Sequence, residues 1–143
     1  MVEDVAFPGP FALSSLGDVV HATYVGDSDW LVAVQFHFDE GYLSVEVDPD
    51  DDTVDVSFDA LWPPPLRHWS TDSARHTASA SYADVLGLSS SWRWVLRNQQ
   101  GYQDAFQIEL GPSTSTVTLQ YLAMASHLEF RRVTRVLSGR RTV

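Results

Sequence analysis

The segment from residue 30 to residue 58 reads WLVAVQFHFDEGYLSVEVDPDDDTVDVSF, and it decides the fold class. Apolar side chains occupy alternate positions in three consecutive runs, which is the period of a strand with one buried face. The turn-forming stretches Glu40-Gly41 and 48–52 separate these runs. The segment therefore predicts three neighbouring strands of an antiparallel meander.

The register of these strands places charges against one another. If Glu40-Gly41 is a two-residue turn, Phe38 is expected opposite Leu43. His37 is then expected opposite Ser44.

In the next hairpin, pairing the apolar positions puts Glu46 directly opposite Asp55. Like charges at directly opposed positions destabilise a sheet. Together with the stretch 48–52 they form a concentrated acidic edge.

The remaining chain continues the β pattern after an interruption. An earlier run, 18–25, predicts a fourth strand, which completes an acidic half at about 15–60. Pro63-Pro64-Pro65 opens a connection at 62–80 that is not a central strand, because proline lacks the ladder donor. Strand patterns return in the second half, 81–136.

The second half adds about four strands and one short element. Residues 81–88 are expected to form a helix with Ser81 as its N-cap. In the first strand pattern Trp92 and Trp94 share one face and are expected in the core, as is Trp30. The Arg-rich tail 137–143 is expected to fray.

These patterns together predict a single domain, 1–143, that is α+β or mainly β, with seven to eight antiparallel strands and one short helix.

The charges are distributed unevenly along the chain. There are 19 acidic and 9 basic residues, and the first 60 residues hold 14 carboxylates and no basic residue. A nucleic-acid-binding module shows the opposite, a basic footprint. The chain also has no cysteine and no apolar run long enough to span a bilayer, so disulfides and membrane insertion are not expected.

The acidic edge has two interpretations. It is either a solvated face that keeps the protein soluble or a surface shaped for a basic partner. Arginines of the second half are candidates for internal neutralisation of this edge, namely Arg93, Arg97, Arg131, Arg132 and Arg135. The partner-binding residues that we predict are Glu46, Asp48, Asp50, Asp51, Asp52 and Asp55.

Two patterns resemble metal sites, but neither predicts one. Asp48, Asp50 and Asp52 have the spacing of a calcium loop, with Asp59 at its twelfth position. The sixth position, where that loop requires glycine, is Thr53, so a hydrated hairpin loop is favoured.

His37, Asp39 and Glu40 lie close in sequence without a third ligand at a suitable spacing, and a polar histidine on an exposed face is favoured. No metal, cofactor or catalytic residue is therefore expected.

Aromatic residues offer an alternative site. Trp62 and Trp69 flank the proline-rich connection, where they either pin it onto the sheet or form an exposed patch. The alternative is a ligand pocket between sheet and connection, lined by Trp62, Trp69, His37 and Tyr102. The segment 98–104 is expected to form a hydrogen-bonded turn with Gly101 at positive φ, or else a polar recognition loop.

The stretch SWRWVLRNQQGYQD at 91–104 and the segment AMASHL at 123–128 resemble a family of small bacterial proteins of unknown function. The likeness covers most of residues 15–136, and it implies no catalytic residue. In size and charge the chain is also similar to immunity proteins that neutralise bacterial toxins.

The leading hypothesis is a non-enzymatic, cytoplasmic bacterial protein whose acidic face binds a basic partner, in its most specific form a cationic toxin. The alternatives are a small-molecule-binding or enzymatic domain and a subunit, including a homo-oligomer, that pairs through an open sheet edge.

Overall fold

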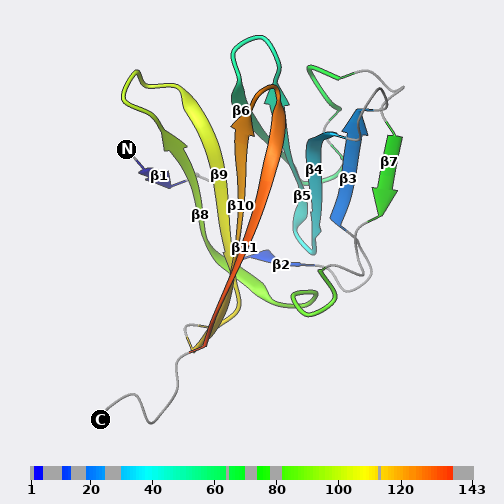
Figure 1. Ribbon diagram of the computed structural model, residues 1–143. Coiled ribbons are helices and arrows are strands. Elements are labelled where there is room, and N and C mark those ends of the chain that lie inside the picture. Colours follow the sequence, from blue (N-terminus) through cyan, green and yellow to red (C-terminus); the bar gives the residue numbers. More distant parts are fainter. Residues whose placement is uncertain are drawn as a thin grey trace.

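The computed structural model describes residues 2–4, 11–13, 19–24, 30–63, 65–69, 74–77, 82–112 and 114–136. Two antiparallel sheets pack against each other in this structure (Figure 1). The strands are β1 (Val2–Asp4), β2 (Phe11–Ala12), β3 (Val19–Tyr24), β4 (Trp30–Phe38), β5 (Gly41–Asp48), β6 (Thr53–Asp59), β7 (Ala74–Thr77), β8 (Ser89–Arg97), β9 (Gln103–Leu110), β10 (Ser115–Met124) and β11 (His127–Val136).

Two meanders of four strands, β3 to β6 and β8 to β11, form the centres of the two sheets, and the short strands β1, β2 and β7 join them. The first sheet, which we call sheet A, has the order β1-β8-β9-β10-β11, and β2 also pairs with β8. Sheet B has the order β6-β5-β4-β3-β7. The mainly antiparallel β fold that the sequence predicts is confirmed, with β1, β2 and β7 as additional short strands.

The expected short helix is replaced by a turn. The N–H groups of Val85 and Leu86 both donate to the Tyr82 carbonyl, and the segment ends at Gly87, whose φ is +84°. Gly87 N–H then donates to the Leu13 carbonyl, so the chain leaves the helical path after one turn. The described residues contain no helix, and Ser81, the expected N-cap, lies outside them, as does the tail 137–143.

The second hairpin of sheet B has the predicted register, and the first does not. Glu46 lies opposite Asp55, as predicted. In the first hairpin Phe38 lies opposite Gly41 and His37 opposite Tyr42, so the turn is one residue earlier, at Asp39-Glu40.

Gly41 explains this difference. It is already part of β5, and a Cβ there would lie 2.7 Å from the Asp59 carbonyl oxygen and 2.8 Å from the Ala60 Cα. Glycine is thus required by the close approach of the end of β6, not by the turn. The register differs by two residues, so the side chains beside this turn keep their predicted faces, with Phe36, Phe38 and Leu43 in the core.

The core lies between the two sheets. Its largest fully buried side chains include Phe36 and Phe38 of sheet B and Phe106 and Tyr121 of sheet A. Tyr82, from the turn at 82–87, inserts beside them, and its hydroxyl lies 2.7 Å from that of Tyr121. This contact satisfies two polar groups that burial would otherwise leave without a partner.

The faces of β8 are the reverse of the prediction. Trp92 is 51% exposed, whereas Arg93 is only 4% exposed. The Arg93 guanidinium donates to the carbonyl and the hydroxyl of Ser90 at 3.1 and 3.2 Å, which satisfies part of its donor set. Its aliphatic stem can therefore be buried, while Trp92 and Trp94 stack on each other on the outer face, with centroids 6.0 Å apart.

Trp30 is also not a core residue. It is 43% exposed, and its ring lies against that of His127, with centroids 5.4 Å apart.

Candidate functional site

Two hairpin turns, one from each sheet, are joined at one end of the molecule (Figure 1). The Asp52 carboxylate accepts the N–H of Ala125 at 3.1 Å and the N–H of Ser126 at 3.0 Å. The Ser126 hydroxyl donates back to the Pro49 carbonyl at 3.0 Å. Residues 49–52 and 125–126, which we call the double-turn tip, are thus tied together across the sandwich.

The backbone of the double-turn tip is unusual. Asp52, Ala125 and Ser126 all have positive φ, at 55°, 52° and 64°. Positive φ is strained for a residue other than glycine, so hydrogen bonds from the surrounding residues must stabilise this backbone conformation. The two carboxylate oxygens of Asp52 supply such bonds to the two other strained residues. Asp52 is therefore a structural residue of the tip.

The other aspartates of the turn have different roles. Asp48 closes it, because its carboxylate accepts the Asp50 N–H at 2.9 Å and its carbonyl accepts the Asp52 N–H at 2.8 Å. Asp50 and Asp51 are exposed, and their carboxylates make no hydrogen bond or ion pair within the described part of the chain. They are the free charges of the tip.

A second group, the His68 cluster, consists of Glu46, Asp48, Asp55 and His68. His68 Nε2 is within hydrogen-bonding distance of Asp55 Oδ2, and its Nδ1 lies 3.9 Å from Asp48 Oδ1. Ligand atoms of Asp48, Asp55 and His68 all lie within 4.8 Å of one another. These three side chains are the described residues that could hold a metal ion.

The backbone next to His68 is fixed to β5 on both sides. The Glu46 carboxylate accepts the Arg67 N–H at 2.7 Å and the His68 N–H at 3.4 Å. The Trp69 indole donates to the Val47 carbonyl at 2.8 Å. Glu46 is 4% exposed and faces Asp55, and these backbone donors account for the burial of its charge.

The pKa of His68 depends on its carboxylate neighbours. Burial lowers this pKa, but the hydrogen bond with Asp55 and the negative charges of Asp48, Glu46 and Asp55 outweigh burial, and the pKa lies above the ordinary value of 6.5. When the imidazole is protonated, its charge offsets part of the repulsion between Glu46 and Asp55.

Comparison with known proteins identifies the family of the chain. A family model matches residues 11–137, which spans both sheets. The chain belongs to DUF6334, a family of unknown function. No curated protein and no solved structure matches it. The resemblance to a family of unknown function is thereby confirmed, and the roles of the residues in this DUF6334 chain rest on its own structure.

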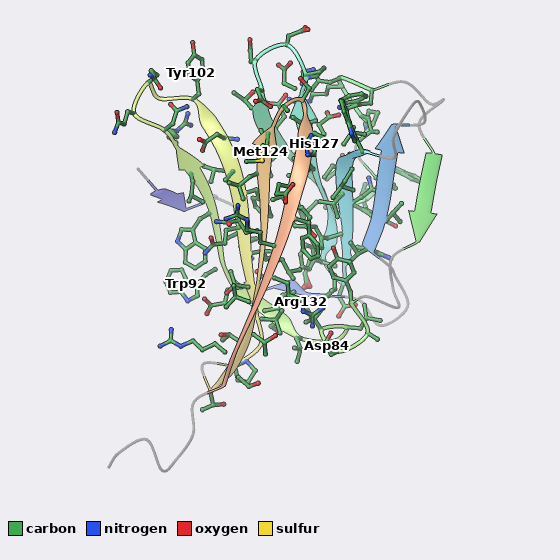
Figure 2. The ribbon with its side chains drawn as sticks, viewed as in Figure 1. Asp84, Trp92, Tyr102, Met124, His127 and Arg132 are labelled. Carbon is green, nitrogen blue, oxygen red and sulfur yellow. The ribbon has the colours of Figure 1, made fainter. Side chains whose placement is uncertain are left out.

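Of the six predicted partner-binding residues, four serve the fold. Glu46, Asp48, Asp52 and Asp55 take part in the contacts described above, and Asp50 and Asp51 remain free. The arginines named as internal counter-charges do not reach them in the described contacts. Arg132 instead pairs with Asp84 (Figure 2), and Arg97 donates to the Gly101 carbonyl at 3.2 Å.

The calcium spacing does not assemble a site. Asp59 lies at the opposite end of β6 from the turn, where its carboxylate accepts the N–H groups of Leu61 and Trp62 at 2.8 Å each. These bonds lower the pKa of Asp59, with burial opposing them weakly. Both carboxylate oxygens of Asp52 already accept the N–H groups of Ala125 and Ser126. The residues 48–52 form the hairpin turn between β5 and β6.

The four residues of the alternative pocket are not gathered at one point, because Trp69 bonds to Val47 of β5 and Tyr102 belongs to a turn of sheet A. His37 stacks on Tyr42, with centroids 4.5 Å apart, near the turn between β4 and β5. Trp69 pins the connection onto β5, one of the two expected roles. Trp62 is 72% exposed, and Tyr102, at 56%, stands at the turn between β8 and β9 (Figure 2).

The turn at 98–102 has the structural role that the sequence predicts. The Asn98 side-chain oxygen accepts the N–H groups of Gln100 and Tyr102, at 2.9 and 3.1 Å, and Gly101 has a φ of +85°.

A hollow of about 480 Å³ lies on the outer face of sheet A, and sequence reasoning missed it. Glu109 with Arg131 and Arg135 are its charged residues, and the stacked pair Trp92 and Trp94 lies on the neighbouring strand, at positions paired with β9. The sequence signal for this hollow is the alternation of polar and apolar residues in β9, β10 and β11, because the polar positions of all three strands lie on the same outer face. The lining residues are Gln107, Glu109, Thr116, Thr118, Gln120, Arg131, Val133 and Arg135.

No helix in the described residues combines the length and apolar character that crossing a membrane requires.

Proposed function

We propose that this protein is a non-enzymatic protein-binding domain that recognises a basic partner through the double-turn tip. The observation that carries the proposal is the division of labour in the tip. Asp52 and Asp48 hold the backbone, so that Asp50 and Asp51 present two carboxylates without internal partners on a braced turn. A braced charged turn loses little conformational entropy on binding.

Exposed apolar side chains next to the tip support the same function. Met124, which precedes the Ala125-Ser126 turn, is 46% exposed, and it lies opposite His127 in the hairpin (Figure 2). His127 in turn contacts the half-exposed Trp30. Aromatic and methionine side chains beside a charged rim are characteristic of protein–protein interfaces.

The charge of the protein supports a basic partner. The formal net charge is −10, which would steer a cationic protein toward the molecule and accelerate association. The most specific form of the proposal is a bacterial, cytoplasmic immunity protein that covers a cationic toxin. Its support is size and charge.

The test uses a matched pair of charge reversals. Asp51→Lys changes the tip, whereas Asp39→Lys changes another exposed aspartate, in the turn at the other end of β5. Both variants have the same net charge. The partner is first captured from native-host extract on the immobilised protein, and its association rate is then measured against salt concentration.

We expect Asp51→Lys to slow association about tenfold at low salt and to weaken its salt dependence, and Asp39→Lys to change the rate much less. Equal rates for the two variants would show that only net charge matters and would contradict the proposed interface.

A second candidate function is binding of a small polar molecule in the hollow on sheet A. Its volume is within the usual range of ligand sites, and two guanidinium groups, a carboxylate and two side-chain amides line it. A thermal-shift screen of metabolites tests this candidate with Arg131→Ala as the variant. A stabilising compound whose effect persists in Arg131→Ala would locate the ligand elsewhere.

A further inference from the structure

The His68 cluster brings one imidazole to three carboxylates of the acidic edge, a contact that the sequence pattern does not predict. Asp48 and Asp55 come from the neighbouring strands β5 and β6, and His68 comes from the connection more than ten residues later. Within the described chain the other close contact between histidine and a carboxylate, His127 with Glu129 at 3.7 Å, involves a single carboxylate that is 45% exposed. The convergence at His68 is therefore a distinct feature of this structure.

We propose that Asp48, Asp55 and His68 form a binding site for a divalent transition-metal cation, with Zn²⁺ as the best match. An imidazole nitrogen with two carboxylate oxygens is a ligand set that zinc accepts, and it differs from the all-oxygen set that calcium and magnesium prefer. This site adjoins the proposed partner interface, because the Asp48 carboxylate also accepts the Asp50 N–H in the turn of the tip. Metal binding does not depend on the proposed function, and the experiment below measures it without the partner.

The spacing of the three ligand atoms suits a single ion. They lie within 4.8 Å of one another, and ligand atoms around one tetrahedral zinc ion are roughly 3.3 Å apart, given metal–ligand distances of about 2.0–2.1 Å. Because Asp48 lies beside Nδ1 and Asp55 beside Nε2, a single ion requires the Asp48 side chain to rotate toward Asp55. The ring nitrogen that already faces Asp55 is the one best placed to share an ion with that carboxylate.

The charge balance also favours a divalent cation. The carboxylates of Asp48 and Asp55 lie beside the imidazole of His68, and that of Glu46 bonds to the backbone N–H of the same residue. A divalent ion offsets two of these three negative charges. Glu46 adds its charge without being needed as a ligand, because its oxygens already accept two backbone N–H groups.

The site is braced and partly open. The Glu46 carboxylate accepts the backbone N–H groups of Arg67 and His68, and the indole of the next residue, Trp69, donates to the Val47 carbonyl. Such bonds position a ligand before the ion binds. The side chains of Asp48, His68 and Asp55 are 17%, 24% and 34% exposed. An ion can therefore enter from solvent, and water can complete its coordination.

The test is calorimetric titration of the tag-free full chain with ZnCl₂ at neutral pH, after treatment with a chelator. We expect one ion per chain with micromolar affinity. His68→Gln and Asp55→Asn should each weaken binding about tenfold or more. The matched control His127→Gln removes a histidine that also lies beside a carboxylate, and it should bind zinc as the unmodified protein does.

Two further measurements keep the proposal testable if a variant unfolds. Zinc should shift the ring resonances of His68 in the NMR spectrum of the unmodified protein and leave those of His127 in place. Calcium should bind more weakly than zinc. Absence of zinc binding to the unmodified protein, equal binding by His68→Gln, or a shift at His127 alone would overturn the proposal.

Discussion

The outer faces of the two sheets use their charged side chains in opposite ways. On sheet B, Glu46 and Asp55 are partly covered by the segment 65–69, and their charges are met by backbone N–H groups and His68. On sheet A, Arg131 and Arg135 are exposed around an open hollow. A count of charges along the sequence therefore does not tell which of them remain available to a partner.

The largest expected difference between the two faces concerns tryptophan. Trp69 packs against the core and donates to the Val47 carbonyl, so Trp69→Ala should lower the free energy of unfolding by about 2–3 kcal/mol. Trp92 is half exposed and loses mainly its stacking on Trp94, so Trp92→Ala should cost about 1 kcal/mol or less. Chemical denaturation measures both, and a larger effect for Trp92 would mean that the two faces have been misassigned.

Glutamate gives the next comparison. Glu46→Ala leaves the N–H groups of Arg67 and His68 without their acceptor and should cost about 1–2 kcal/mol, reduced by the loss of repulsion with Asp55. Glu109→Ala on sheet A should change stability by about 0.5 kcal/mol or less. Chemical denaturation of the two variants measures this difference in stability. Identical midpoints would contradict a structural role for Glu46.

The smallest expected effect is a pH-dependent change in stability when an arginine of β11 is replaced. The hydrogen bond from Arg132 lowers the pKa of Asp84, burial opposes it weakly, and the positive charge of Arg132 adds to the lowering. A carboxylate with a lowered pKa stabilises the folded state above its ordinary pKa of 3.8 and loses that contribution as the pH falls through its folded value.

Arg132→Gln should therefore be slightly less stable than the unmodified protein near neutral pH, by a few tenths of a kcal/mol because the pair is exposed, and equally stable in acid. Arg131→Gln, which lacks an ion pair in the described residues, should show no such convergence. Denaturation curves at several pH values provide the comparison, and parallel profiles for the two variants would rule out the Asp84 contact as the cause.

Much of the fold follows from periodicity, because alternation identifies both the strands and their buried faces. The register of β5 with β6, including Glu46 opposite Asp55, is predictable from the valines alone. Sequence reasoning fails for β8, where it treats arginine as polar throughout and tryptophan as apolar throughout. In the structure the aliphatic stem of Arg93 is buried because its guanidinium donates a hydrogen bond to the Ser90 carbonyl. Trp92, on the other face of the strand, remains half exposed.

The sites were predictable only in part. The acidic turn is visible as a run of aspartates, but its division into structural and free residues depends on a turn more than seventy residues later. The position of His68 over β5 and β6 likewise depends on a connection without periodicity. Contacts of this kind leave no regular pattern in the sequence, since they involve single residues of irregular segments.

The division of the tip into structural and free carboxylates is the central claim, and one pair of variants tests it directly. Asp52→Asn and Asp51→Asn each remove one negative charge from the same turn, so any relief of repulsion is similar in both. The free energy of unfolding should fall by about 1 kcal/mol for Asp52→Asn, which weakens the bonds to Ala125 and Ser126, and should change by about 0.5 kcal/mol or less for Asp51→Asn. Equal effects, or a larger effect at Asp51, would contradict the claim.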